Sequence, residues 1–296
     1  MKILLIGHSV LDRIETREGT ATKPGGLFYS AVTMANLKSA EDEIYLLTSY
    51  DNHFYNFFEP IYGKLNINFS NLTDKIPVVH LKIYDDKERD EIYENFTSKL
   101  KINDGIDFTI FDGILINMIT GNDISVEDLE KIRKSFRGKI YFDIHSLSRT
   151  TEDGNRKVFR KIPEAEKWLT HIDILQCNDL EATTIIASDN LFETARYVLE
   201  RGPEYFIVTL KDKGVRLFSV ENNELESVFI AAHKFNGINK VGCGDTFGAS
   251  FFYSYIRTGN IYYSLKFANL AAGLSTTYYK PEDFGKLKND IDGKID

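Results

Sequence analysis

The residues with the clearest potential for chemistry lie at positions 240–248, Lys-Val-Gly-Cys-Gly-Asp-Thr-Phe-Gly. Gly242 and Gly244 flank Cys243, Asp245 follows at once, and a helical pattern continues beyond it. We predict a glycine turn that leads into a helix N-terminus. The unpartnered first amides of such a helix bind anions, and a carboxylate placed there can take a proton beside a phosphate. A tight turn with Asp245 as a helix cap explains the same residues equally well.

Asn178 and Glu181 form a second pair with chemical potential, because they lie three residues apart where a helix is expected to begin. An amide and a carboxylate at this spacing could hold a hydrated Mg²⁺, which usually keeps several of its waters. The same spacing is that of a capping box, in which Asn178 is the N-cap and Glu181 reaches back to it. Spacing alone leaves both interpretations open.

Two further features lie near the start of the chain. Asp12 follows the first expected strand, and in open α/β sheets the ligand crevice lies beyond the carboxyl ends of the strands. Gly25 and Gly26 precede a helical pattern, which suggests close approach of the backbone to a small ligand. A solvated loop aspartate and an ordinary turn are the alternatives.

Short apolar runs alternate with helical patterns along most of the chain. This order predicts a three-layer α/β/α fold with a mainly parallel central sheet, whose strand ends gather polar residues at one rim. The expected strands are residues 2–7, 43–48, 111–118, 139–144, 172–177 and 205–210, and the expected helices are 27–37, 52–63, 125–136, 160–170, 179–186 and 190–201.

The rest of the chain departs from this alternation in two places. Residues 76–84 and 90–95 read as a hairpin around a polar turn at 85–88, which is either a lid or a dimer contact. After residue 210 come two short strands, 214–220 and 226–231, and then two long helices, about 244–257 and 260–278. We expect a single domain over residues 1–296, with a β lid formed by about 10–24 and 76–96.

The composition excludes several classes of function. Lysine and arginine number 36 against 44 acidic residues, so the formal charge is 36 − 44 = −8, and without a basic tract nucleic acid is not an expected partner. The two cysteines, Cys177 and Cys243, form no CxxC pattern, which suits a reducing compartment and argues against structural zinc. No run of eighteen apolar residues and no secretion signal is visible, so we expect a cytoplasmic protein without a membrane segment.

Taken together, these features resemble the ribokinase-like (phosphofructokinase B type) family of sugar and nucleoside kinases. Residues 239–245 are similar to the family's C-terminal signature, Asp-Thr-x-Gly-Ala-Gly-Asp, whose last aspartate is the catalytic base. The resemblance implies that Asp245 is this base and that the backbone of Gly242, Cys243 and Gly244 forms the anion hole. It also implies that the alcohol substrate is bound by a small set of residues near the N-terminus: Asp12, Gly25, Gly26 and Ser30.

The resemblance also implies a site for ATP and magnesium. Asn178-x-x-Glu181 matches the element tied to Mg²⁺, which Glu181 would reach through water. Residues 207–214 resemble the nucleotide loop, and residues 143–149 resemble an Asp-Pro-Asn-x-Arg segment that ends in Arg149. The implied ATP contacts are Asn178, Thr209, Lys211, Gly214 and Asn269, the last on the final helices against which adenine would lie.

Several positions depart from the family pattern. Asn239 stands in place of aspartate, which puts a neighbouring monovalent-cation site in doubt, and Cys243 stands in place of alanine. Lys240 is either a phosphate contact or an exposed lysine. Ser30 replaces an asparagine and Lys211 a glycine, which affects the expected contacts of the sugar and of ATP. None of these changes removes the base.

The implied function is transfer of the γ-phosphoryl group of ATP to a hydroxyl of a sugar, polyol or nucleoside. A non-catalytic sugar- or nucleotide-sensing protein on the same scaffold is the alternative. A dinucleotide-dependent oxidoreductase fits poorly, because Gly242 to Gly248 spaces its glycines as GxGxxxG and the first strand turn has one glycine. The sequence does not identify the substrate; His8 and Tyr29 are further candidates for its pocket, and a homodimer through the lid is a further possibility.

Overall fold

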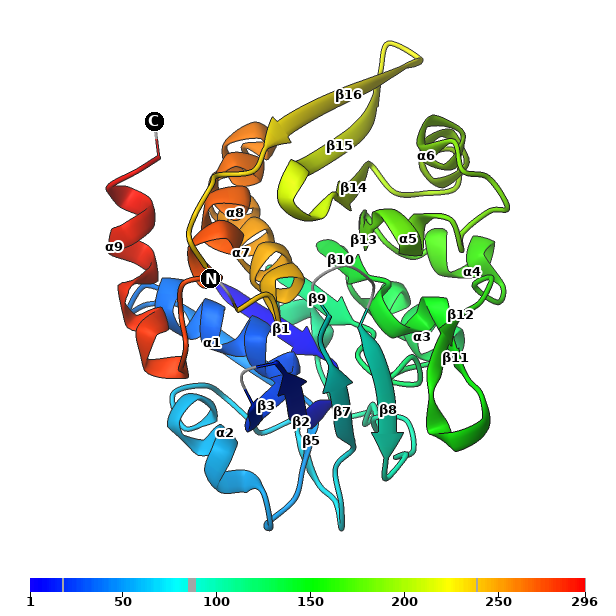
Figure 1. Ribbon diagram of the computed structural model, residues 1–296. Helices are drawn as coiled ribbons and strands as arrows, with labels where there is room; N and C mark the ends of the chain where they lie inside the picture. The colour runs from blue at the N-terminus through cyan, green and yellow to red at the C-terminus, as the bar shows by residue number, and fades with distance from the viewer. Residues whose placement is uncertain (18, 85–88, 238, 296) are drawn as a thin grey trace.

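In the computed structural model, which describes residues 1–17, 19–84, 89–237 and 239–295, eight strands form a central sheet (Figure 1). Six neighbouring strands are parallel, and the last two are antiparallel additions at one edge. The strands lie in the order β16 (Glu224–Ala231), β15 (Gly214–Glu221), β14 (Tyr205–Thr209), β13 (Ile174–Asn178), β10 (Lys139–Asp143), β9 (Gly113–Asn117), β1 (Lys2–Ile6) and β4 (Glu43–Leu47).

Helices cover both faces of this sheet, because its strands are apolar on both sides. In β1, Ile3 and Leu5 belong to one buried cluster, and Leu4 and Ile6 belong to the other. The first cluster includes α1 (Leu27–Leu37), α2 (Tyr55–Tyr62), α7 (Cys243–Thr258), α8 (Ile261–Ser275) and α9 (Leu287–Asp292). The second includes α3 (Val126–Ser135), α4 (Ala165–Leu169), α5 (Asp179–Ala182) and α6 (Leu191–Leu199). The predicted three-layer α/β/α class is confirmed.

A second, four-stranded sheet lies in front of the carboxyl end of β1 (Figure 1). Its strands are β3 (Gly19–Gly26), β2 (Ser9–Thr16), β7 (Val78–Lys82) and β8 (Asp90–Glu94), in that order. Asp12, for which a solvated loop was the alternative, lies within β2, because the chain passes from β1 into this sheet after only two residues. The predicted polar turn at 85–88 lies outside the described residues.

Several short elements are absent from the sequence prediction. Arg149, which ends the segment similar to Asp-Pro-Asn-x-Arg, opens a short strand, and the chain continues past α8 into two further helical segments. These elements are too short to show a clear period. They are β5 (Ser49–Tyr50), β6 (Asn71–Leu72), β11 (Arg149–Thr151), β12 (Lys157–Phe159), and the 3₁₀ segments η1 (Phe108–Ile110), η2 (His145–Ser148), η3 (Asp153–Asn155), η4 (Lys211–Lys213) and η5 (Pro281–Lys286).

The order of the strands decides where a ligand can bind. The chain places β4 on one side of β1 and β9 on the other, so the connections diverge at the carboxyl end of β1. Crevices form at such switch points. Within the described part of the chain, no helix is both long enough and apolar enough to span a membrane.

Candidate active site

The N-terminus of α7 is built by a glycine that no other residue could replace without strain. Gly242 is the N-cap, with φ of 80° in the left-handed region. A Cβ at this position would lie 2.3 Å from the ring of Tyr29. The turn therefore presents the first amides of α7, those of Cys243, Gly244 and Asp245, which have no acceptor earlier in the helix. This is the glycine turn and helix start that the sequence predicts.

Asp245 lies in the first turn of α7 and lines a cleft between this helix and the four-stranded sheet. Its Oδ1 accepts a hydrogen bond of 2.5 Å from the Nδ2 of Asn117, the last residue of β9. Gln176 stabilises the opposite side of the turn. Its Nε2 donates hydrogen bonds to the Gly244 carbonyl at 3.2 Å and to Asp143 Oδ2 at 3.0 Å. Two strand ends thus position the carboxylate.

Asp12 faces Asp245 across the cleft. It is only 4% exposed, and burial raises its pKa to about 8, because Arg89 only partly offsets the loss of water and the charge of Asp245 adds to the rise. A Cβ on Gly25 would lie 2.1 Å from Asp12 Oδ2, so this glycine makes room for the carboxyl group. Gly26, with φ of 62°, also lines the cleft and is the N-cap of α1.

The cleft, counted together with the open solvent at its mouth, has a volume of about 380 Å³. Its walls include the apolar side chains of Val10, Val79, Leu81 and Ile119. Four charged or titratable residues of the lining were not predicted from the sequence: Arg89, Glu91, Tyr93 and His145. Glu91 could have been identified from the alternating pattern of residues 90–94, because this pattern places an acidic residue on the buried face of β8.

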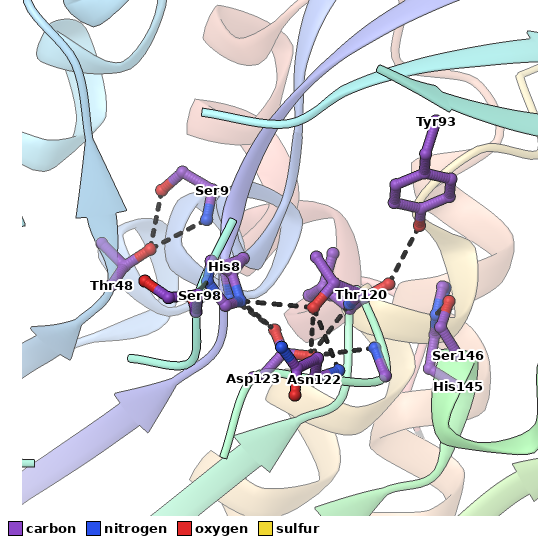
Figure 2. Close-up of polar contacts among 12 residues, drawn as sticks. His8, Ser9, Thr48, Tyr93, Ser98, Thr120, Asn122, Asp123, His145 and Ser146 are labelled. Carbon is purple, nitrogen blue, oxygen red and sulfur yellow. Dashed lines mark hydrogen bonds and ion pairs between the residues drawn. The ribbon is translucent and has the colours of Figure 1, made fainter. Parts of the chain in front are cut away.

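Two of the proposed substrate contacts lie elsewhere. Ser30 is buried in α1 and is not part of the described lining, and its Oγ has no partner among the described residues. His8 was a candidate pocket residue, but its ring is buried and held by Asp123 Oδ1 at 2.9 Å and by the Ser98 carbonyl at 3.2 Å (Figure 2). Tyr29, in contrast, does line the cleft.

Figure 2 shows what the His8 network supports. Asp123 also accepts from the backbone and hydroxyl of Thr120, at 2.9 and 3.0 Å, and so fixes the loop after β9. The Tyr93 hydroxyl donates to the carbonyl of Ile119 in the same loop at 3.0 Å. His8 therefore stabilises the loop that supplies one apolar wall of the cleft.

Asn178 and Glu181 form a capping box. The Glu181 amide donates to Asn178 Oδ1 at 2.8 Å, and the Asn178 amide donates to Glu181 Oε2 at 2.9 Å. Burial raises the pKa of Glu181 against the opposing charges of His145 and Arg149, and burial together with the charges of Glu181 and Asp245 raises that of Asp143. Capping and cation binding remain compatible, because the box uses one carboxylate oxygen.

The fit to magnesium can be tested on these carboxyls. No group of three or more His, Cys, Asp or Glu side chains in the described ranges is arranged to hold a metal directly. Mg²⁺ needs only one or two carboxylates when it keeps its waters. Burial disfavours the charged forms of Glu181 and Asp143, and a cation beside them would stabilise those charged forms. The residues therefore fit a hydrated ion held by Glu181 through water.

Of the remaining residues predicted to contact ATP, Thr209 and Asn269 form hydrogen bonds within the protein. Thr209, at the end of β14, donates to the Cys177 carbonyl at 3.4 Å. Gly214 begins β15, and a Cβ there would lie 2.0 Å from the Ile230 carbonyl, so its packing role is in the hairpin. Lys211 is exposed with φ of 55°. Asn269 is buried, and its Nδ2 donates to the Ala231 carbonyl at 2.8 Å.

Asn239 and Cys243, which depart from the family pattern, and Arg149, which ends a segment that resembles it, all have local contacts. The side-chain amide of Asn239 donates a hydrogen bond to the Tyr278 carbonyl oxygen at 3.0 Å, so this oxygen has a hydrogen-bond partner within the protein. The Cys243 thiol points to the Asn239 carbonyl, 3.6 Å away, and burial raises its pKa to about 11. Arg149 is buried with its guanidinium 4.1 Å from the centre of the Phe159 ring.

The arrangement thus combines an anion-binding helix start, a carboxylate beside it, and a cleft with a second carboxyl group opposite. A carboxylate within reach of a bound hydroxyl can accept its proton, and the adjacent amides can stabilise charge that develops on a phosphoryl group.

Comparisons with known proteins agree with this chemistry. A family model described as pfkB family carbohydrate kinase matches residues 124–284. None of the curated proteins compared with the chain matches it. Among solved structures, a pyrophosphate-dependent kinase of the ribokinase family, bound to a pyrophosphate analogue and myo-inositol, is 17% identical with a TM-score of 0.79, covering 99% of both chains.

Two ribokinase structures are similar as well. The ribokinase of Thermotoga maritima is 20% identical with a TM-score of 0.73, covering 99% of this chain and 98% of its own. The ribokinase of Arabidopsis thaliana, complexed with ribose and ATP, is 16% identical with a TM-score of 0.71, covering 97% and 98%. At these identities the likeness concerns the fold.

Proposed function

The chain belongs to the pfkB family of carbohydrate kinases, phosphotransferases with an alcohol group as acceptor, and from this premise we propose that Asp245 is the catalytic base. The observation that carries the proposal is its position: it lies on the first turn of α7, held by Asn117, and lines the cleft opposite Asp12. A hydroxyl bound between the two carboxyl groups would be next to both the base and the helix amides.

The reaction follows from this geometry. Asp245 accepts the proton of the substrate hydroxyl while that oxygen attacks the terminal phosphorus of the donor, and the rest of the donor leaves with the electrons of the broken P–O bond. The amides of Cys243, Gly244 and Asp245 hold the charge on the transferring group. Mg²⁺, held through water by Glu181 and by Asn178, would supply positive charge to the phosphate oxygens.

The substrate side is formed by Asp12, Gly25 and Gly26. We assign the four-stranded sheet the role of a lid that keeps water from the transferring group, since strands β2, β7 and β8 all contribute to the cleft. Ser30, buried behind the cleft, would act on the substrate only through its neighbours.

ATP is the donor we propose, with contacts from Asn178, Thr209, Lys211, Gly214 and Asn269. Pyrophosphate is a second candidate, since the structurally similar inositol kinase uses it and two observations disfavour an adenine site. The Asn269 amide is already bonded to Ala231, and a Cβ on Gly273 would lie 2.9 Å from the ring of Phe235, which thus covers this part of α8. Phe235→Ala should change the KM for ATP and leave that for pyrophosphate unchanged if adenine binds here.

Asp245→Asn tests the assignment, because it keeps the shape of the side chain and removes the base. With either donor and a panel of sugars, cyclitols and nucleosides, kcat should fall by roughly 10²–10⁴-fold. Cys243→Ala is the matched control: it keeps the helix amides, and its thiol faces Asn239, so activity should stay within about threefold of the parent. Turnover by Asp245→Asn at the parent rate would refute the proposal, and absence of transfer by the parent protein would favour the sensing alternative.

A further inference from the structure

The inward face of the four-stranded sheet is apolar except at two positions. Aligned rows run across strands β2, β7 and β8: Asp12 pairs with Val79 and Val79 with Tyr93, while Ile14 pairs with Leu81 and Leu81 with Glu91. All six side chains are buried. The sheet therefore presents two carboxyl groups to the cleft, Asp12 and Glu91, on a surface that is otherwise hydrocarbon and one tyrosine.

Glu91 is the more unusual of the two. It is 1% exposed, and its Oε1 accepts a hydrogen bond of 2.7 Å from Arg89 Nε. Its Oε2 has no hydrogen-bond partner within the described part of the chain, although it is buried. An uncovered buried carboxylate oxygen is costly, and in a cleft it is a place for a hydrogen-bond donor from a ligand.

The strand that carries Glu91 is held from outside. On one side of it, Asp90 Oδ1 accepts from Arg156 at 2.5 Å. On the other side, the ring of Tyr93 lies 4.9 Å below the ammonium group of Lys157, which also donates to the Thr120 carbonyl at 2.8 Å. The hairpin between β11 and β12 thus braces β8, so the position of Glu91 is fixed before a ligand binds.

The charge state of Glu91 differs from that of Asp12. Burial works to raise its pKa, but the charges of Arg89, Arg149 and His145 outweigh burial and lower it to about 2. A carboxylate that is ionised accepts hydrogen bonds only, whereas Asp12, with its raised pKa, can also donate one.

We propose that Glu91 determines which alcohol substrates bind: its uncovered Oε2 accepts a hydrogen bond from a hydroxyl of an uncharged polyol and repels substrates that carry a carboxylate or phosphate. This inference rests on the proposed function. Asp12 and Glu91 lie two strands apart, roughly 10 Å at ordinary strand spacing. A ligand that reaches both has hydroxyls at separated positions, as a monosaccharide or cyclitol does, and a simple alcohol does not.

The test uses the full-length protein with two neutral probes, myo-inositol and D-ribose, and an acidic one, D-gluconate. Glu91→Gln removes the charge and keeps the shape, and Glu94→Gln is the control, because Glu94 lies on the outward face of the same strand and is exposed. For Glu91→Gln we expect Kd and KM for the bound neutral probe to rise about 10- to 100-fold, the range for a lost hydrogen bond to a charged group. Its kcat should change little, and the ratio of kcat/KM between neutral and acidic probes should fall at least tenfold.

Binding measured by calorimetry without a donor separates this inference from the assignment of the base. If Glu91 only stabilises the sheet, neutral and acidic probes will lose kcat/KM to the same extent and their ratio will not move, which overturns the proposal. An unchanged Kd in Glu91→Gln also overturns it. Weakened binding of a neutral probe by Glu91→Gln, but not by Glu94→Gln, supports it even where Asp245→Asn shows the base to be misassigned.

Discussion

On the substrate side of the site, buried polar groups can still bind a ligand, whereas on the side of the phosphoryl donor the polar groups already form hydrogen bonds within the protein. Around the cleft, Glu91 keeps a buried oxygen uncovered, and burial keeps Asp12 largely protonated near neutral pH. On the donor side, Asn178 and Glu181 bond to each other, and Asn269 bonds to Ala231. The substrate pocket is thus preorganised, while the donor residues hold the backbone in place.

This contrast shows that a buried polar group can serve either ligand binding or the stability of the fold, depending on whether it already has a hydrogen-bond partner. A buried group without a partner costs free energy and is retained where a ligand compensates for it. A group with a complete set of partners stabilises the fold whether or not a ligand binds. Substitutions on the substrate side should therefore change activity and pH dependence, and those on the donor side should first change stability.

The largest effect is expected at Gly242. In Gly242→Ala the new methyl group meets the Tyr29 ring at 2.3 Å, at a φ of 80° that alanine disfavours. Overpacking and the left-handed backbone together cost roughly 2–5 kcal/mol. Displacement of the first turn of α7 should lower phosphoryl transfer at least about 100-fold. Urea unfolding and steady-state kinetics measure both effects.

Gly244→Ala is the control for this experiment. A Cβ there meets nothing closer than Gln176 Nε2 at 3.9 Å, and alanine favours a helix more than glycine does. Its free energy of unfolding should equal or slightly exceed that of the parent. Equal losses of stability in the two variants would contradict the strained turn.

The next effect is the pH dependence of stability caused by Asp12. Burial raises its pKa to about 8 in the folded protein, against 3.8 as the ordinary value, so between these pH values the folded state holds one more proton than the unfolded state. Stability contributed by this group is therefore present below about pH 4 and is lost as pH rises toward 8, with a slope of up to about 1.4 kcal/mol per unit.

Asp12→Asn should remove this slope. Urea unfolding at pH 5, 6 and 7 should show the stability of the parent falling relative to Asp12→Asn as pH rises. Asp189→Asn, at an exposed aspartate between α5 and α6, should keep the slope of the parent. Parallel curves for Asp12→Asn and the parent would show that the buried carboxyl is already ionised in this pH range.

The sequence predicts the main helices, strands and turns of this molecule well, because these elements depend on local sequence patterns. The run at residues 2–7 and the helix at 27–37 follow from hydrophobic period, and Gly242 and Asp245 follow from turn chemistry at a helix start. The Asn178–Glu181 spacing also predicts the capping box, which it allowed as an alternative.

What the sequence could not predict depends on contacts between distant segments. Glu91 enters the cleft only because β8 pairs with β7, and Asn117 reaches Asp245 across 128 positions of the chain. His8 was misplaced because Asp123, 115 positions away, turns its ring from the cleft. The hydrogen bond of Asn269 to Ala231 also depends on a return of the chain, across 38 positions.

A smaller effect is expected at Asn117, which belongs to the substrate side. Asn117→Ala removes the hydrogen bond to Asp245 Oδ1 and should lower kcat about tenfold, in keeping with the value of a hydrogen bond to a charged group. The same change made in Asp245→Asn should cost less than about twofold, because the base that Asn117 positions is absent. Equal costs in both backgrounds would assign Asn117 a role independent of the base.

The smallest effect separates capping from magnesium binding on the donor side. Asn178 caps α5, and Asn190 caps α6 by accepting from the Phe192 amide at 3.0 Å. Asn178→Ala and Asn190→Ala should each lose about 1 kcal/mol of unfolding free energy, as N-cap removal does. Only Asn178→Ala should also raise the Mg²⁺ concentration needed for half-maximal activity, by about three- to tenfold, because it alone lies beside Glu181 and the donor. An identical Mg²⁺ requirement in the two variants would mean that Asn178 contributes only the capping box. Its part in binding the phosphoryl donor would then be limited to holding the backbone at the start of α5.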